Sequence, residues 1–143
     1  MLAQEKRKVS TPAASTVRFV RDIPGFSGIQ HYKILEPAEG TPFYRLMPDS
    51  EEFSFLLLHT FDYFGDYDFE LPKQEQDLLQ LNKESKILVF SIVNWGSGLK
   101  AATVNLKAPI VVNPANGSAL QIILDTEMYK VKEPLLPAIM KSR

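Results

Sequence analysis

The feature that most constrains the fold is a succession of short apolar runs separated by residues that favour turns. The runs are rich in aromatic and β-branched residues and are bounded by Pro, Gly, Asp or Ser, which is typical of β-strands joined by tight connections. They occupy residues 16–20, 31–35, 43–47, 53–61, 86–95, 101–113 and 118–126. Because most runs follow one another without an intervening helix, the sequence predicts an antiparallel all-β barrel or sandwich rather than a parallel α/β sheet.

Two turn signals and one helical pattern refine this prediction. Pro24-Gly25 suits a tight turn, since proline presets φ and glycine accepts a positive φ. Asn116-Gly117, between the last two runs, indicates a hairpin. One short helix is expected within residues 71–81, where Pro72 fits the first turn and leucines form an apolar edge.

The length of 143 residues fits one domain with a core of its own. Residues 1–15 combine basic residues with a Ser/Thr/Pro/Ala run and are expected to form a flexible N-terminal arm. The β domain is expected over residues 16–136 and a C-terminal tail over 137–143.

Composition points to a cytoplasmic protein. Hydrophobic residues make up 45% of the chain, charged residues 23%, and there are no cysteines, so disulfides and thiolate metal sites are excluded. No apolar run approaches the roughly 20 residues that span a bilayer, and the start lacks the apolar stretch of a secretion signal. We therefore expect neither a membrane segment nor export.

Charge is unevenly distributed along the chain. Between Asp49 and Asp77 there are nine acidic residues and a single basic one, Lys73, although the net charge of the whole chain is only −1. Such a surface can steer a basic partner, but in many proteins an acidic run is merely solvated. The sequence leaves both interpretations open.

The sequence contains few groups that could act in catalysis. The only imidazoles are His31 and His59, and although His59 could pair with Asp62, no nucleophile motif accompanies them. The carboxylates of residues 61–70, "FDYFGDYDFE", could be imagined as a glycosidase pair, yet among so many aromatic residues they are more typical of a contact surface. The sequence predicts no catalytic residue, no metal site and no cofactor.

The segment "NWGSGLKA" approximates a dinucleotide-binding fingerprint, because Gly96, Gly98 and Ala101 follow a good strand. That fingerprint requires a helix to begin at its last positions. Here the following residues are rich in β-branched types and Pro109 forbids a continuous helix, so the glycines indicate a hairpin turn.

Direct binding of nucleic acid is not expected. The aromatic side chains of residues 61–69 could stack on bases, but aspartates, rather than arginines and lysines, are interleaved with them. Carboxylates would repel phosphates. This polarity favours a protein that engages a basic, RNA-binding surface of another protein.

Residues 102–113, "ATVNLKAPIVVN", alternate as a strand with one buried face. The residues predicted to face the core are Val104, Leu106, Ala108, Ile110 and Val112. Pro109 falls on the outward parity, where it predicts an edge, a bulge or a change of sheet. Two interpretations remain for the amides of this stretch: Asn105 and Asn113 bond a bend and a turn, or Asn105 belongs with Lys107 to a binding face.

The stretch also carries a family resemblance. It resembles the "ATANLxAPIVxN" signature of FliW, the bacterial flagellar assembly factors. Further segments agree in order and spacing, and together they cover about residues 16 to 136. They are "IPGF" at 23–26, "TPFYRLMPD" at 41–49, "FDYFGDYDFELP" at 61–72 and "ALQIIL...YKVKEPL" at 119–135.

The resemblance implies a small, mainly β, antiparallel barrel-like domain without enzymatic activity. It also implies two partners: flagellin in the cytoplasm and CsrA, the small basic RNA-binding regulator that represses flagellin translation. It further implies that free FliW sequesters CsrA once flagellin has been exported, which requires the two complexes to exclude each other. The chain is expected to be a monomer. The alternative is an RNA- or carbohydrate-binding β-barrel module.

The resemblance and the acidic, aromatic character of residues 61–70 together give a set of candidate partner-binding residues. The four within this segment are expected to contribute to CsrA binding, and two asparagines to support the site or contact flagellin. The set consists of Phe64, Asp66, Tyr67, Asp68, Asn105 and Asn113.

Overall fold

The structure is a computed structural model that describes Ala3, Gln4 and residues 14–141. Its described part is mainly β, with three short helices. The strands are β1 (Ala3–Gln4), β2 (Ala14–Phe19), β3 (His31–Leu35), β4 (Phe43–Pro48), β5 (Phe55–His59), β6 (Lys86–Asn94), β7 (Thr103–Val104), β8 (Ile110–Asn113), β9 (Ser118–Gln121) and β10 (Glu133–Pro134). The helices are α1 (Thr60–Tyr63), α2 (Lys73–Leu78) and α3 (Leu136–Lys141).

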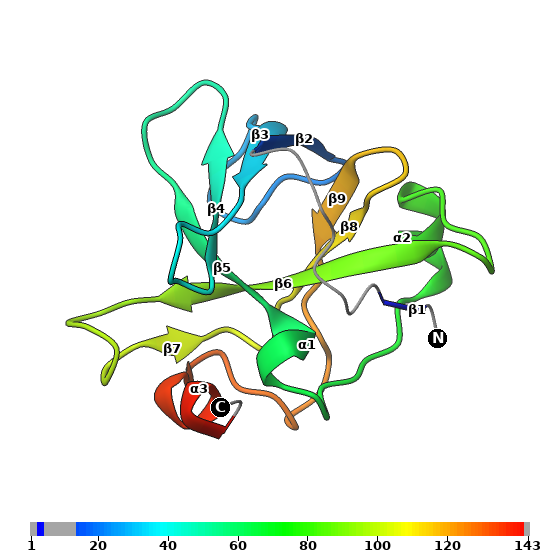
Figure 1. The fold of residues 1–143 in the computed structure, drawn as a ribbon. Helices are drawn as coiled ribbons and strands as arrows, with labels where there is room; N and C mark the ends of the chain where they lie inside the picture. The colour runs from blue at the N-terminus through cyan, green and yellow to red at the C-terminus, as the bar shows by residue number, and fades with distance from the viewer. Residues whose placement is uncertain (1–2, 5–13, 142–143) are drawn as a thin grey trace.

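Seven strands close into a barrel (Figure 1). Around it, the order is β6, β5, β4, β3, β2, β9 and β8, and β8 pairs with β6 to complete the circle. These pairs are antiparallel except that of β2 with β9. The predicted antiparallel β-barrel class is confirmed.

Apolar residues form two cores, one on each side of the barrel wall. On β5, Leu57 belongs to an inner core of strand side chains, whereas its neighbour Leu58 belongs to an outer core. The outer core also holds Leu79 and Leu135, which lie outside the barrel strands, so it joins the flanking segments to the wall. Burial of apolar surface stabilises a fold by about 25 cal/mol per Å². Because this part of the barrel wall buries apolar side chains on both sides, both faces contribute to its stability.

The stretch from β7 to β8 confirms the break expected at Pro109. Both strands pair with β6, but residues 105–109 lie opposite only Ser91 and Ile92. The extra residues form a large bulge, in which Asn105 Oδ1 accepts hydrogen bonds from the amides of the second and third residues after it at 3.0 and 3.1 Å. The bulge lets β7 and β8 pair with β6 in two registers.

All five residues predicted to face the core along this stretch are buried, but they do not face a single core. The outer core contains Val104, which precedes the bulge, and Leu106, which lies in its first half. Ile110 and Val112, after it, belong to the inner core. The bulge therefore moves the alternating pattern from one side of the wall to the other.

The expectation of a free opposite face is wrong for the second half of the stretch, because Pro109, Val111 and Asn113 are buried too. The outer core packs on that side of β8, which the alternation alone could not reveal. Asn105 and Lys107, in the bulge, are half-buried.

Helix α2 lies within the predicted residues 71–81, but Pro72, which was expected in the first turn, is the residue just before the helix and has an extended backbone. Its Glu75 is buried, and Arg21 Nη1 donates a hydrogen bond to Glu75 Oε2 at 2.9 Å, which ties the helix to the chain just after β2. Helices α1 and α3 were not predicted. Helix α1 overlaps the end of the apolar run 53–61, and α3 lies mostly in the region expected to form the C-terminal tail.

The predicted turns have the backbone that they require. Gly25 has a φ of +89° and Gly117 a φ of +75°, in the left-handed region that favours glycine. Gly98 lies in the turn between β6 and β7, which pair with each other, so the predicted hairpin is confirmed. No helix follows it before β7, and the dinucleotide-binding interpretation of "NWGSGLKA" is therefore excluded.

The two ends of the chain lie partly outside the described residues. The arm predicted over residues 1–15 includes β1, which pairs in parallel with the start of β6, and the first residues of β2. Its remaining residues, 1–2 and 5–13, are not described, and neither are residues 142–143 of the predicted tail.

Candidate functional site

The acidic aromatic segment (residues 61–70) begins within α1 and leads toward α2 on the outside of the barrel. Its anchor is Tyr67, which is only 4% exposed and belongs to the outer core. The Tyr67 hydroxyl donates a hydrogen bond to the carbonyl oxygen of Leu106 at 2.7 Å, so the segment is fixed to the bulge between β7 and β8. Tyr67, which was predicted as a contact residue, therefore also holds the segment in place.

The residues on either side of the anchor, Asp66 and Asp68, are both exposed. The backbone amide of Asp68 donates a hydrogen bond to the Tyr129 hydroxyl at 2.9 Å, and the rings of Tyr67 and Tyr129 lie 4.6 Å apart between centroids. The segment therefore presents two carboxylates to solvent from a backbone that is held at residues 67 and 68.

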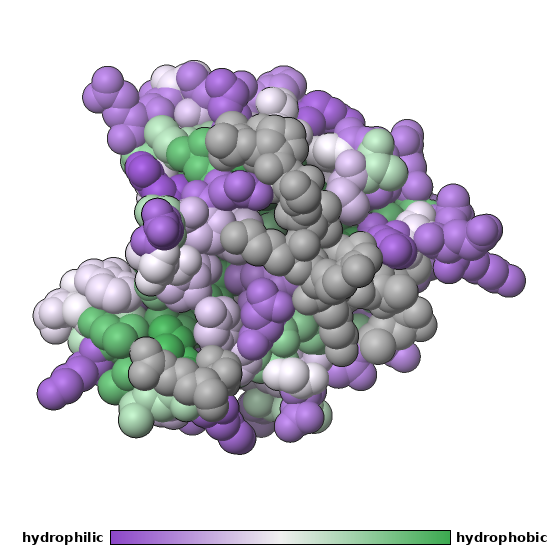
Figure 2. All heavy atoms as spheres, in the orientation of Figure 1, coloured by the Kyte–Doolittle hydropathy of each residue, from purple (hydrophilic) through white to green (hydrophobic). Residues whose placement is uncertain are grey.

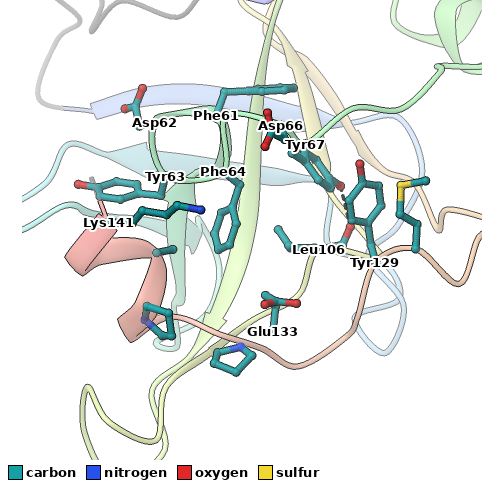
Figure 3. A pocket seen from close by; sticks show the side chains of 15 residues that line it. Phe61, Asp62, Tyr63, Phe64, Asp66, Tyr67, Leu106, Tyr129, Glu133 and Lys141 are labelled. Carbon is teal, nitrogen blue, oxygen red and sulfur yellow. Dashed lines mark hydrogen bonds between the residues drawn. The ribbon is translucent and has the colours of Figure 1, made fainter. Parts of the chain in front are cut away.

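A cleft of about 690 Å³ opens between this segment and the C-terminal wall (residues 128–141). Figure 3 shows Phe64 and Glu133 directed into the same space, with Leu106 beside them. The cleft is lined by Phe61, Asp62, Tyr63, Phe64, Gly65, Asp66, Tyr67, Leu106, Met128, Tyr129, Glu133, Pro134, Pro137, Ala138 and Lys141. Three of the predicted contact residues, Phe64, Asp66 and Tyr67, thus share one cavity.

The C-terminal wall was not predicted as part of the site. Met128 in the cleft is 75% exposed, and Val131 and Met140 on the same wall are exposed as well. In Figure 2, which has the orientation of Figure 1, apolar residues gather at the lower left over α3 and β7, while most of the visible face is hydrophilic. Exposed apolar groups beside an aromatic cleft are typical of an interaction surface, and flexible methionines adapt to partners.

Burial also changes the acidity of the aromatic hydroxyls around the cleft. Desolvation raises the pKa of Tyr67 above its ordinary value of 10.0, and Tyr129 adds a smaller effect in the same direction. The pKa of Tyr63 is raised by desolvation and, to a lesser degree, by the negative charge of Asp62. Both hydroxyls are therefore neutral hydrogen-bonding groups at neutral pH.

The two predicted asparagines lie away from the cleft lining and are used within the chain. Asn113 is 3% exposed; its Nδ2 donates to the carbonyl of Leu79 at 2.8 Å, and its Oδ1 accepts from the amide of Ala115 at 3.0 Å. Asn105 is half-buried and holds the bulge through its Oδ1 atom. These contacts match the interpretation in which the amides bond a bend and a turn.

The two side chains considered as an acid–base pair in the sequence lie close to each other. His59 Nδ1 lies 3.2 Å from Asp62 Oδ2, but His59 is only 6% exposed and its ring packs against Phe90. The nearby hydroxyls of Thr60 and Ser91 are buried and bond each other at 2.7 Å. Within the described residues, no group of three or more His, Cys, Asp or Glu side chains is placed to hold a metal ion.

Comparison with known proteins agrees with the fold and the motifs. The family model described as "FliW protein" matches residues 3–135. A flagellar assembly factor FliW of Alkaliphilus metalliredigens is 34% identical over 127 residues, covering 87% of this chain and 78% of the relative. The corresponding protein of Bacillus licheniformis is 35% identical over 121 residues, covering 84% and 85%.

The similarity extends to three dimensions. A crystal structure of the flagellar assembly factor FliW superposes with a TM-score of 0.78 at 32% sequence identity, covering 85% of this chain and 86% of that one. None of the helices in the described ranges is long and apolar enough to cross a membrane. On its motifs, its barrel and these matches, the chain belongs to the FliW family of flagellar assembly factors.

Proposed function

We propose that this flagellar assembly factor acts in the cytoplasm by binding flagellin and, when free of flagellin, by binding CsrA. Binding CsrA relieves its repression of flagellin translation, so the two complexes couple translation to export. The resemblance of the motifs to FliW and the family match support this proposal. The protein acts only by binding its partners and has no enzymatic activity, catalytic residue or cofactor.

The observation that carries the proposal is the display of Asp66 and Asp68 around the buried ring of Tyr67. A rigid backbone lowers the conformational entropy lost on binding, and exposed carboxylates raise the rate of encounter with a basic partner. CsrA is expected to be such a partner, because an RNA-binding surface is rich in positive charge.

The aromatic side of the cleft supplies the apolar part of the contact. Phe64 is partly buried against the outer core and lines the cleft, so a partner side chain can pack on its ring without a rearrangement of the core. Buried aromatic anchors carry much of the binding energy of protein interfaces, while surrounding charges set orientation and rate. Asn105 supports this site through the bulge that carries Leu106, and Asn113 acts within the fold or contacts flagellin.

The direct test reverses the two exposed charges. We expect Asp66→Lys together with Asp68→Lys to weaken CsrA binding at least about tenfold in calorimetry. The matched control is Glu51→Lys with Glu52→Lys, which makes the same change of charge at two other exposed residues of the acidic run, outside the cleft lining. Equal affinity of the two double variants would show that the segment does not form the CsrA site.

A second experiment separates the alternative function. Labelled RNA, CsrA and flagellin are mixed separately with the wild-type protein, which is also run alone by size-exclusion chromatography to check that it is a monomer. Direct binding of RNA in the absence of CsrA would favour an RNA-binding barrel. The exposed carboxylates beside the cleft argue against it, because phosphates would be repelled.

A further inference from the structure

Glu133 in the C-terminal wall is a charged residue of the cleft that the sequence patterns did not single out. It belongs to β10, where it lies opposite Val104 of β7. Figure 3 shows its carboxylate within the cleft, on the side of Phe64 that faces the wall. The place of Glu133 in the fold is therefore set by β-pairing, and its side chain is presented to whatever enters the cleft.

The backbone around Glu133 is held on both sides of the residue. After it, the amide of Leu135 donates to the carbonyl of Ala102 at 3.1 Å. Before it, the carbonyl of Lys130 accepts from the amide of Leu106 at 3.0 Å. A partner that meets Glu133 therefore meets a preorganised group, which reduces the entropy lost on binding.

Glu133 is a half-buried residue, and its carboxylate forms no ion pair or side-chain hydrogen bond with the described residues. Its neighbours in the lining include Leu106 and Pro134, whose side chains offer no donor to a carboxylate. A charged group that is partly withdrawn from water is stabilised when a cation or a hydrogen-bond donor reaches it.

The charges of the lining have one dominant sign. Asp62, Asp66 and Glu133 contribute three carboxylates. Lys141 contributes the one basic side chain among the lining residues, and Figure 3 shows it extending toward Phe64. A partner with a positive group at Glu133 and an apolar group at Phe64 is complementary to this arrangement.

We propose that the cleft binds a segment of the basic partner, CsrA, in which a lysine or arginine reaches Glu133 while a neighbouring apolar side chain packs against Phe64 and Leu106. The inference rests on the proposed function and adds the chemistry that the site selects. The carboxylate of Glu133 attracts the positive group of the partner, whereas the positive charge of Lys141 repels it. An arginine suits this task well, because it can donate two parallel hydrogen bonds to one carboxylate.

The test compares the CsrA affinities of two variants, one that removes a negative charge from the cleft and one that removes a positive charge. Glu133→Gln keeps the shape of the side chain and should weaken CsrA binding at least about tenfold, and the remaining affinity should depend less on ionic strength. Lys141→Gln should leave CsrA binding unchanged or strengthen it. Glu127→Gln is the matched control, because Glu127 is an exposed residue just before the C-terminal wall and does not line the cleft.

Thermal unfolding of each variant checks that the fold is intact. The inference is overturned if the wild-type protein binds CsrA and Glu133→Gln binds it as well as Glu127→Gln does, or if Lys141→Gln weakens binding as much as Glu133→Gln. In both cases the proposed function stands. If the wild-type protein does not bind CsrA at all, the proposed function fails and this inference falls with it.

Discussion

Asn113 and Asp66 are both polar residues inside the segments that relate this chain to its family, yet they lie in opposite environments. Asn113 is 3% exposed and bonds two backbone groups, whereas Asp66 is exposed beside the cleft. Their surroundings differ in the same way: the asparagines of residues 103–118 bond the backbone, and the aspartates of residues 61–70 face solvent. The most specific motif of the chain is therefore a folding element, and the acidic aromatic segment is the proposed contact surface.

The packing of the turn between β8 and β9 against the end of α2 explains why the two regions differ. The carbonyl of Leu79, just after that helix, accepts hydrogen bonds from three side chains of the turn. They are Asn113, Asn116 and Ser118, at 2.8, 3.3 and 3.3 Å. A buried carbonyl needs such donors. The acidic aromatic segment, in contrast, buries its anchor and leaves its aspartates outside.

The largest effect on stability is expected from Asn113→Ala. The change removes a buried donor from the Leu79 carbonyl and an acceptor from the Ala115 amide, which should lower the free energy of unfolding by about 2 kcal/mol in urea denaturation. The control is Asn94→Ala, which removes an exposed turn contact to Gly96 and should cost less than about 1 kcal/mol. Equal losses for the two variants would contradict the assignment of Asn113 as a buried folding residue.

A smaller loss is expected from Tyr67→Phe, which keeps the ring and removes the hydroxyl bond to the Leu106 carbonyl. It should lower the free energy of unfolding by about 1 kcal/mol at neutral pH. Urea denaturation again provides the measurement. An unchanged stability would mean that the ring, and not its hydroxyl, fixes the segment.

The pH dependence of the same variant gives a sharper check. Burial raises the pKa of Tyr67 in the folded state, so the unfolded chain releases this proton first. The stability contributed by the group is fully present below the ordinary pKa of 10.0 and is lost as pH rises above it. The stability difference between wild type and Tyr67→Phe should therefore be constant below about pH 10 and shrink above it. A difference that widens would contradict the assignment.

The smallest effect on stability is expected from the double variant Asp66→Lys with Asp68→Lys. Both side chains are exposed, so the free energy of unfolding should change by less than about 0.5 kcal/mol. Urea denaturation of this variant, set beside its CsrA affinity, tests whether binding and folding are separable at this segment. A loss comparable to that of Asn113→Ala would mean that the segment belongs to the folding elements.

The strands could be predicted because their signals are local. Alternation along residues 102–113 indicated buried residues and Pro109 indicated the break, since both depend only on the chain's own period and on proline geometry. The closure of the barrel through β6 with β8 could not be predicted in the same way. Pairing between distant strands depends on the register of the whole sheet, and both faces of β8 are buried by segments that the alternation does not contain.

Only one side of the candidate site could be predicted. The acidic aromatic segment is evident from its composition, but Glu133 and Lys141 meet Phe64 only through the pairing of β10 with β7 and the packing of α3. Nothing in "YKVKEPL" marks Glu133 as different from the other charges nearby. Helix α3 begins with Leu136-Pro137 and has only a weak helical pattern, so the sequence did not indicate that it would line one side of the cleft.

The most direct measurement of the central claim is hydrogen–deuterium exchange on the wild-type protein with and without CsrA. Binding at the proposed surface should slow exchange of the amides in residues 61–70 and 128–141. Exchange in residues 103–118, which are already held by the barrel and α2, should change little. Protection confined to residues 103–118 or to the loop between β4 and β5, with residues 61–70 unaffected, would contradict the account.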